Sequence, residues 1–528
     1  MPSVTTADGR TASPAPALAA PPAPVAWRWI LPIVAVGAAV ACFSSSRYHL
    51  FGDELYFIGA GHRPSVSYAD QGPALPLLAR VGVSWWGGHL VLFRLPGIVL
   101  GLASVVLAAL TARELGGGRG AQILTTVAAC LSPFVLLQSQ LLATNAVDAP
   151  FWSAITLLLV RWVRTRRDRL LLTAGVLTAI DMQVKWLIPG FWVALAIAVA
   201  AAGPRELLRR PALWLGGLVT VVTTLPAVLW QNSQGWPYFH LTEQVAAEGA
   251  LTGGRLLYLP LLLLYAGPLG AVLTCCALWW LLRAPDWRPY RFLAVTFLLL
   301  AAAVWLVAGR PYYAGGLYIV LIAVGSVELA RRWQGERSDG GSTEQGERSD
   351  GGAGVPVVLR ALLAVGAVLG VATIVVFLPL ARQSHITPPK DLASATLRTT
   401  PYGQFGWPEL TRDVEQAVAA LPPDRKPDAI ITEMYWQAGS LDYYGDSGLP
   451  VYSYSRGYGW LGTPPDSARR VVWVGVDDDA AKYCARSTLL RHIGTDRIGF
   501  PTASTDVDIR YCEMSTPWSR IWGQMRRM

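Results

Sequence analysis

Ionisable and phenolic side chains lie in or beside long apolar segments of this sequence, where a charged group marks a functional site by default. A carboxylate at such a place can take a proton from a hydroxyl group. A cation there can stabilise a phosphate group as it leaves. The residues are Asp53 and Glu54 in FGDELYF, Asp70 in YADQGPALPLL, Asp148 in TNAVDAPFW, Lys185, and Arg310 with Tyr312 and Tyr313 in RPYY.

Lys185 is unusual because the chain has forty arginines and only four lysines, and the next lysine is Lys390. An ammonium group is a compact point charge, whereas a guanidinium group is a planar fork. The choice of lysine therefore suggests that a small cation is needed at this position. The alternative is a lysine at a helix end that extends its ammonium group to the membrane surface.

The composition is that of a membrane protein. Of the 528 residues, 53% are hydrophobic and 15% are charged, whereas soluble domains are about 25% charged. An ordinary soluble enzyme, a disordered chain and a fibrous protein are excluded. The net charge of +9 belongs to residues 1–381, and residues 382–528 are neutral overall. The basic balance therefore reflects membrane topology and gives no support to nucleic-acid binding.

Eleven apolar segments are long enough, or nearly so, to cross about 30 Å of hydrocarbon. The chain is predicted to be a polytopic α-helical membrane protein. Two of the segments, 170–184 and 186–202, are short and could merge or tilt. The predicted spans are 27–44, 89–111, 121–141, 147–163, 170–184, 186–202, 213–231, 255–282, 290–308, 314–330 and 355–381.

Positive charges alternate between the loops, as the positive-inside rule requires. With the N-terminus in the cytoplasm, internal segments hold 18 Lys and Arg residues and external loops hold 6. Eleven spans then place residues 382–528 outside a bacterial cytoplasmic membrane. Residues 1–26 are predicted to be a disordered tail, and residues 333–354, which contain QGERSDGG twice, a flexible cytoplasmic linker.

Residues 382–528 are predicted to form a small extracytoplasmic α/β domain on the membrane domain of residues 27–381. Helical spacing occurs at 407–421, and buried strands are expected at 429–432 and 471–476. Cys484 and Cys512 would face an oxidising compartment, where they could form a disulfide or remain two buried thiols.

The candidate residues are scattered along the chain, yet this topology puts all of them on the external side. A transport pathway should place some charges near the midplane. Carboxylates and cations on one face suit transfer of a sugar from a lipid phosphate, in which a base deprotonates the acceptor and cations stabilise the leaving phosphate. The sequence has no P-loop, no GxGxxG that follows a predicted strand, no HExxH and no CxxC motif.

The sequence resembles the GT-C glycosyltransferases, in the branch of protein O-mannosyltransferases and lipid A aminoarabinose transferases. The resemblance rests on the order of several landmarks over about residues 45–325, and more loosely over 403–460. It implies inverting transfer from a polyprenyl-phosphate sugar to an outer-face acceptor, which could be a glycan, a glycolipid or a protein hydroxyl. The landmarks are DELY (53–56), YADQGPALPLL, FRLPG (93–97), DAPFW (148–152), NSQGWP (232–237), RPYY (310–313), FGWPEL and WQAGSLDYYG.

Roles in the proposed chemistry follow from this resemblance by position. Asp53 would be the general base, and Asp148 a second carboxylate that orients the acceptor or the sugar. Glu54 and Asp70 would line the same cavity. At Gln71-Gly72-Pro73 the chain departs from the usual acidic residue and Pro-Pro pair, which leaves the role of Asp70 open. The resemblance implies that Lys185 and Arg310 contact the donor phosphate, with Tyr312 or Tyr313 nearby.

Simpler interpretations remain for the individual residues. Asp53 could be a plain loop residue, Asp148 a helix N-cap, and Arg310 an interface anchor. A divalent metal held by His49, His62 and Glu54 is the less favoured reading, because histidines near a membrane surface usually bind nothing.

Two other functions remain for the whole chain. A polyprenyl-linked sugar transporter or flippase would show midplane charges and inverted repeats. A non-catalytic scaffold displaying residues 382–528 would tolerate Asp53→Asn and Lys185→Ala.

Overall fold

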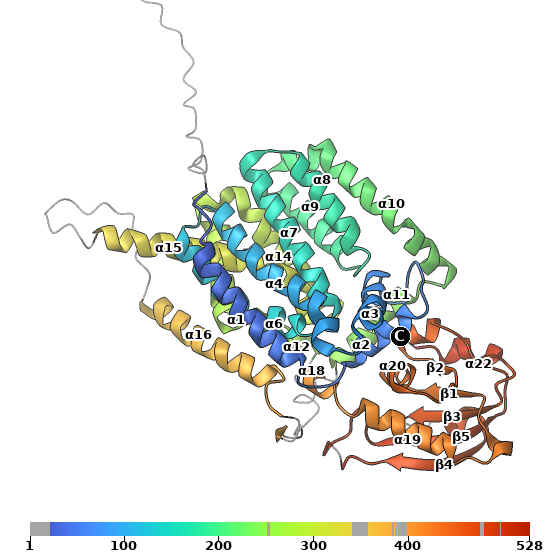
Figure 1. Cartoon of the computed structure of the whole chain (residues 1–528). Coiled ribbons are helices and arrows are strands. Elements are labelled where there is room, and N and C mark those ends of the chain that lie inside the picture. The colour runs from blue at the N-terminus through green and yellow to red at the C-terminus, as the bar shows by residue number, and fades with distance from the viewer. Residues whose placement is uncertain are drawn as a thin grey trace, which may run out of the picture.

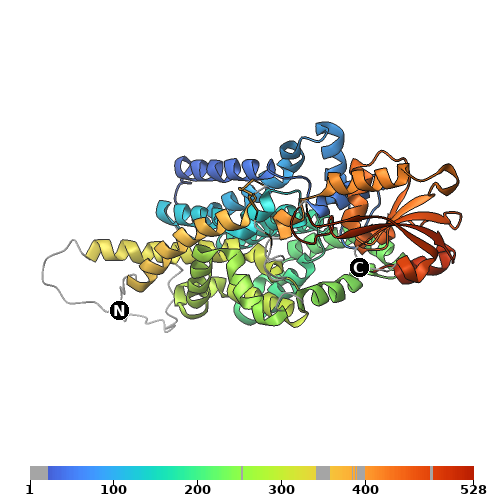
Figure 2. The same ribbon diagram turned by 90° about the horizontal axis from the view of Figure 1, so that it is seen from below.

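The computed structural model describes residues 22–250, 254–339, 357–382, 385–386, 388, 399–475, 480–496 and 498–527. Most of the predicted tail (1–26) and linker (333–354) lies outside these ranges. The described chain consists of a bundle of apolar helices with a mixed α/β domain at one end (Figures 1 and 2). The chain is therefore a polytopic helical membrane protein with a small C-terminal sheet domain, as predicted.

In the described residues, seven helices are long and apolar enough to cross a bilayer, or up to nine if each of two bent pairs forms one span. Two shorter apolar helices, α9 and α13, accompany them. The seven are α1 (Trp27–Ser45), α4 (Leu90–Glu114), α7 (Thr144–Thr165), α10 (Pro211–Ser233), η3 with α14 (Pro285–Tyr290, Arg291–Leu306), η4 with α15 (Pro311–Leu317, Tyr318–Asp339) and α16 (Val357–Phe377). The two bent pairs are α5 (Arg119–Cys130) with α6 (Pro133–Ser139), and α11 (Pro237–Ala250) with α12 (Gly254–Ala266). The shorter helices of the bundle are α8 (Arg169–Asp181), α9 (Ile188–Ala202) and α13 (Pro268–Arg283).

The single span predicted at 255–282 is wrong, because the chain breaks there into α12 and α13. Gly267 between them has φ +80°, a conformation that favours glycine. Its position also leaves little room for a side chain, since a Cβ would lie 2.8 Å from the Leu131 carbonyl oxygen. Pro268 then begins α13, where its missing N–H costs no helical hydrogen bond.

Short helices outside the apolar spans gather at the bundle end that meets the C-terminal domain (Figure 1). The sequence analysis treated these stretches as external loops. They matter because α2 carries Asp53 and Glu54, and α11 borders the same region. The first two of these helices are α2 (Gly52–Gly61) and α3 (Ala74–Trp86).

The C-terminal domain is built on a five-stranded sheet with the order β2-β1-β3-β5-β4. Strands β2, β1 and β3 are parallel, and β5 runs antiparallel to both β3 and β4. The predicted helix and both predicted strands are confirmed as α19, β1 and β3. The strands are β1 (Ala429–Thr432), β2 (Val451–Ser453), β3 (Arg470–Gly475), β4 (Cys484–Ile493) and β5 (Val507–Met514), and the helices are α18 (Thr399–Tyr402), α19 (Trp407–Ala419), α20 (Tyr435–Tyr444), η7 (Arg456–Trp460), α21 (Ala480–Tyr483) and α22 (Trp518–Met525).

Cys484 and Cys512 form a disulfide that joins the start of β4 to β5. This confirms one of the two alternatives left by the sequence. The other four cysteines, in the apolar helices, are free thiols.

Candidate active site

The site begins at the contact between α2 and α20, which lie side by side where the two domains meet (Figure 1). Two glycines allow the close approach. A Cβ on Gly52 would overlap the indole of Trp436, and a Cβ on Gly439 would lie 2.8 Å from the backbone carbon of Leu55. The GDELYF and WQAGS motifs are therefore two halves of one interface.

Asp53 receives its partners from the C-terminal domain. Its Oδ1 accepts a hydrogen bond from the Tyr435 hydroxyl at 2.8 Å and another from the Trp436 Nε1 at 2.9 Å. The carboxylate is half-buried. Because both donors are rigid aromatic groups on one helix, they fix the orientation of the carboxylate and leave Oδ2 available to accept a proton.

Asp70 lies in the loop between α2 and α3 and accepts a hydrogen bond from Tyr56 at 2.7 Å. Burial raises the pKa of Asp70 to about 6, although the hydrogen bond from Tyr56 and the positive charge of Arg456 oppose the rise. The Asp53 carboxylate is close enough to contribute to the rise. Asp70 and Asp53 thus belong to one acidic group.

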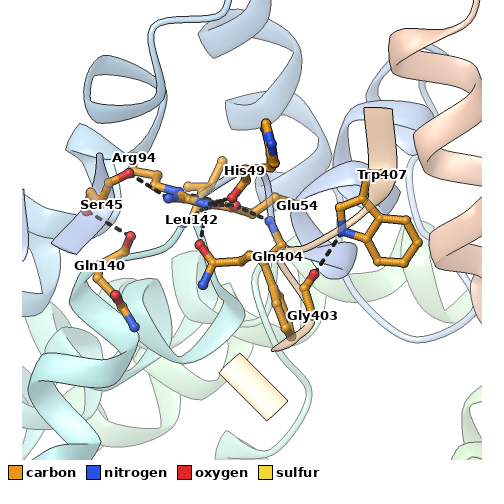
Figure 3. A network of polar contacts seen from close by, with 10 residues as sticks. Ser45, His49, Glu54, Arg94, Gln140, Leu142, Gly403, Gln404 and Trp407 are labelled. Atoms are coloured by element: carbon orange, nitrogen blue, oxygen red, sulfur yellow. Dashed lines mark hydrogen bonds and ion pairs between the residues drawn. The ribbon is translucent and has the colours of Figure 1, made fainter. Parts of the chain in front are cut away.

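Glu54 has a different environment from its neighbour, because it is fully buried against Arg94 of α4 (Figure 3). The Arg94 Nη2 lies 2.6 Å from the Glu54 Oε2. The backbone N–H groups of Phe51 and Leu142 also donate to this carboxylate, each at 2.8 Å. Arg94 in turn donates to the Ser45 and His49 carbonyl oxygens. Glu54 therefore links α2 directly to α4 and to the backbone at Leu142. Through Arg94 it also links α2 to the chain at Ser45 and His49.

The metal-binding alternative gains no support from this arrangement. Across the described residues, no three His, Cys, Asp or Glu side chains are arranged to hold a metal ion. The Glu54 carboxylate is engaged by Arg94, and His62 is exposed.

A second polar cluster surrounds Lys185, in the turn between α8 and α9. The Lys185 Nζ donates to the Asn145 Oδ1 at 2.6 Å, and it interacts electrostatically with Asp148 and Asp181. Asp148 is buried inside α7 and accepts a hydrogen bond from the Trp152 Nε1 at 3.0 Å. Since α7 begins at Thr144, Asp148 is not the N-cap of its helix.

Asp181, the last residue of α8, is fully buried next to Asp148. Within the described residues, the polar side chains that interact with its carboxyl group are those of Asp148, Trp152 and Lys185. Its carboxyl group faces the carboxyl group of Asp148. The two acids therefore form a buried pair, and the Lys185 ammonium interacts electrostatically with both of them.

Tyr312 connects the lysine cluster to the acids around Asp53. The Lys185 ammonium lies 5.8 Å from the centre of the Tyr312 ring and 4.6 Å from that of Tyr313, within the range of cation–π attraction. Arg310 and Asp53 both interact electrostatically with Tyr312.

Arg310 is held by Glu248 of α11, with 2.5 Å between its Nη2 and the Glu248 Oε2. The other Glu248 oxygen pairs with Arg456 of the C-terminal domain. Arg456 also lies 5.8 Å from the ring centre of Tyr435 and interacts with Asp53 and Asp70. Two guanidinium groups therefore share one carboxylate at the edge of the acidic group.

The sequence-predicted residues thus occupy one region at the domain junction, with Glu54 behind it in the ion pair with Arg94. The sequence analysis missed several partners. Arg94 and Asp181 had a visible signal, since each is a lone charge in an apolar stretch. The others, which had no such signal because their contacts cross from α11 or the C-terminal domain, are Glu248, Tyr435, Trp436 and Arg456.

Comparison with known proteins supports the resemblance found in the sequence. Residues 70–230 match the family model described as dolichyl-phosphate-mannose-protein mannosyltransferase. The crystal structure of ArnT from Cupriavidus metallidurans bound to undecaprenyl phosphate superposes with a TM-score of 0.59 and 17% sequence identity, over 93% of this chain and 99% of ArnT. The chain has the GT-C fold. The same ArnT in the apo state gives a TM-score of 0.56 at 16% identity, over 89% of this chain and 97% of ArnT.

No curated protein matches the chain by sequence. Within this GT-C fold, the family match covers Asp70, Asp148 and Lys185 but ends before Arg310 and begins after Asp53. The fold therefore extends well beyond the segment that sequence comparison alone identifies.

Proposed function

We propose that the chain is an inverting glycosyltransferase. It moves a sugar from a polyprenyl-phosphate donor to an acceptor at the outer face of a bacterial cytoplasmic membrane. The observation that carries the proposal is the position of Tyr312, which interacts with the carboxylate of Asp53 and with the cations Lys185 and Arg310. The base that acts on the acceptor and the cations that bind the donor phosphate are thereby close enough to take part in one transfer step.

Asp53 takes the proton of the acceptor hydroxyl in this mechanism, while the acceptor oxygen attacks the anomeric carbon of the sugar. The bond between that carbon and the phosphate oxygen breaks, and the lipid phosphate leaves with the electron pair. A positioned carboxylate base contributes about 10² to 10⁴-fold to such a step. The hydrogen bonds from Tyr435 and Trp436 keep the carboxylate in a single orientation.

Lys185 and Arg310 stabilise the phosphate as its negative charge develops, because both side chains are half-buried, where opposite charges attract more strongly than in bulk water. Tyr312 and Tyr313 confine the Lys185 ammonium, and Asp148 with Asp181 holds it from the other side. Asp148 also remains the group proposed to orient the acceptor or the sugar. The lipid-phosphate donor class agrees with the undecaprenyl phosphate bound in the ArnT structure.

The environments of Asp53 and Glu54 suggest different roles for these neighbours. Asp53 is half-buried beside the cations, whereas Glu54 is enclosed with Arg94. We therefore assign Glu54 a positioning role, in which it holds α2 and so the backbone of Asp53. The disulfide between Cys484 and Cys512 supports an external location for the C-terminal domain, since disulfides persist in oxidising compartments.

A transfer assay tests the proposal. Purified protein in lipid is given radiolabelled polyprenyl-phosphate mannose, arabinose and glucose, with a membrane and cell-wall extract as acceptor. Wild type is compared with Asp53→Asn and with Asp424→Asn, which removes the same charge at an exposed position of the C-terminal domain. We expect transfer with one donor, lost at least about 100-fold in Asp53→Asn and unchanged in Asp424→Asn.

Equal transfer by Asp53→Asn and wild type would remove the assigned base. Label that stays on the lipid with every donor, together with movement of that lipid between leaflets in a vesicle assay, would favour a transporter.

A further inference from the structure

An open groove lies between α11 and the C-terminal domain. It has a volume of about 600 Å³ and is lined on one side by α11 and on the other by η7 and α22. Its lining residues His240, Glu243 and Gly523 are exposed, so the groove is accessible from solvent. None of the roles assigned above uses these residues.

One wall of the groove is a single face of α11. His240, Glu243, Gln244 and Ala247 follow one another at the three- and four-residue spacing that places side chains on one face of a helix. The Gln244 Nε2 donates to the Glu248 Oε1 at 3.3 Å. Because Glu248 pairs with Arg310 and Arg456, one hydrogen bond and one ion pair link this wall to Arg310.

The opposite wall presents Trp460 and Arg526. The Arg526 guanidinium lies 5.2 Å from the centre of the Trp460 ring. Within the described part of the chain, no carboxylate pairs with the Arg526 guanidinium. The wall therefore presents the aromatic face of Trp460 next to the Arg526 guanidinium group, whose N–H groups can donate hydrogen bonds to a ligand.

A second cavity, of about 160 Å³, lies beside the groove and shares Trp460 with it. Gly457 forms part of its wall. A Cβ on Gly457 would lie 2.9 Å from the Asp70 Oδ1, so the backbone here rests directly against that carboxylate. Gly457 is therefore a wall that the second cavity shares with the acidic group.

The chemistry of the lining is that of a carbohydrate site. Of the nine lining residues of the larger groove, only Trp460 and Ala247 have apolar side chains. An indole ring packs against the C–H face of a sugar, since its π-face is negative. Amide, carboxylate and guanidinium groups supply the planar donors and acceptors that bind hydroxyls.

We propose that this groove binds the acceptor and that the acceptor is a carbohydrate chain. This inference rests on the proposed glycosyl transfer, because it assigns the acceptor of that reaction. The carbohydrate chain lies along Trp460, with its reacting end toward the acidic group.

Binding of short oligosaccharides of mannose, arabinose, glucose and galacturonic acid to the full chain in lipid nanodiscs tests the proposal without any turnover. Ala247→Trp fills the groove from α11. Thr242→Trp is the matched control, since it adds the same ring at an exposed position of α11 that does not line the groove. Arg526→Ala removes the unpaired cation and leaves the volume open.

We expect at least one oligosaccharide to bind, with its dissociation constant raised at least about tenfold in Ala247→Trp, about three- to tenfold in Arg526→Ala, and less than about twofold in Thr242→Trp. Binding that persists unchanged in Ala247→Trp overturns the proposal. So does binding of serine- and threonine-rich peptides when no oligosaccharide binds.

The same variants separate this inference from the proposed function. If oligosaccharides bind in the groove but wild type transfers no sugar, the activity is refuted and the groove remains a carbohydrate site. If transfer to the cell-wall extract is equal in Ala247→Trp and Thr242→Trp, the activity remains and the groove is refuted as the acceptor site.

Discussion

Glu248 and Arg310 form an ion pair of 2.5 Å, and the same carboxylate also pairs with Arg456. A single negative charge therefore pairs with two guanidinium groups. A lipid phosphate presents the same kind of charge and acceptor oxygens to such a pair. Donor binding and the Glu248 contacts should consequently compete.

Glu248→Gln should therefore tighten the binding of undecaprenyl phosphate, by about three- to tenfold, because the amide no longer neutralises the two guanidinium groups. Arg310→Met should weaken it by a comparable factor. Titration of the lipid phosphate into protein in detergent measures both effects. Weaker binding by Glu248→Gln would instead show that the carboxylate holds the two arginines in place for the donor.

Lys185→Met should raise the KM for the lipid donor and lower kcat/KM by about 100-fold or more, because a charge-assisted contact with the leaving phosphate is lost at a half-buried site. Lys185→Arg should not restore activity, since the ammonium is confined between Asn145 and the Tyr313 ring. Steady-state kinetics with varied donor measures this, with Lys426→Met in the C-terminal domain as the control. Full activity in Lys185→Arg would contradict the need for a compact charge.

Arg94→Met should destabilise the protein by about 3 to 5 kcal/mol, because it leaves the buried Glu54 carboxylate without its cation. The double variant Arg94→Met/Glu54→Gln should lose less than the sum of the two single variants. The exposed pair of Arg166 and Glu206 is the control, and Arg166→Met should cost less than about 1 kcal/mol. Thermal unfolding in detergent ranks the variants, and equal losses for Arg94→Met and Arg166→Met would contradict the prediction.

Asp70 should make stability depend on pH. Its pKa is about 6 in the folded chain against an ordinary 3.8, so the folded chain binds more protons between these values. The free energy of unfolding should therefore fall by about 2 to 3 kcal/mol as the pH rises from about 4 to above 6. Asp70→Asn should melt higher than wild type at pH 8 and at the same temperature at pH 4. A gap of the same size at both pH values would show that burial of the charge is not its cause.

The disulfide should stabilise the C-terminal domain by about 3 to 4 kcal/mol, because it closes a loop between cysteines separated by 28 residues. The double variant Cys484→Ser/Cys512→Ser should melt at a lower temperature than wild type. A reducing agent should lower the melting temperature of the wild type and leave that of the double variant unchanged. If it lowers both alike, another thiol or the reagent itself is responsible.

Much of the site could be predicted from sequence because its members are charges in apolar surroundings. Asp148 and Lys185 are noticeable for this reason, and the alternation of positive loops puts them on the same side as Asp53. By the same logic Arg94 and Asp181 could have been found, since each interrupts an apolar run. They were not predicted because both lie inside predicted spans, whereas the candidate residues were taken mainly from the external loops and span ends.

The remaining contacts depend on distances that no local pattern encodes. The role of Tyr435 and Trp436 could not be predicted from their local sequence, because their partner Asp53 is in another domain. The helices α2 and α11 are too short and too polar to register as spans, so they were read as loops. The break at Gly267 could not be predicted from hydropathy. Both α12 and α13 are apolar, and a hydropathy profile does not show where a helix ends and the chain changes direction.

Asp53 obtains its two hydrogen bonds from residues that follow it by 382 and 383 positions. A ribosome that adds about 5 to 20 residues per second needs roughly 20 to 80 s to make that stretch. Throughout this time the base-bearing helix has been synthesised without the aromatic pair that orients it. The proposed base, Asp53, therefore acquires its fixed orientation only after Tyr435 and Trp436 of the C-terminal domain have been synthesised and have packed against α2.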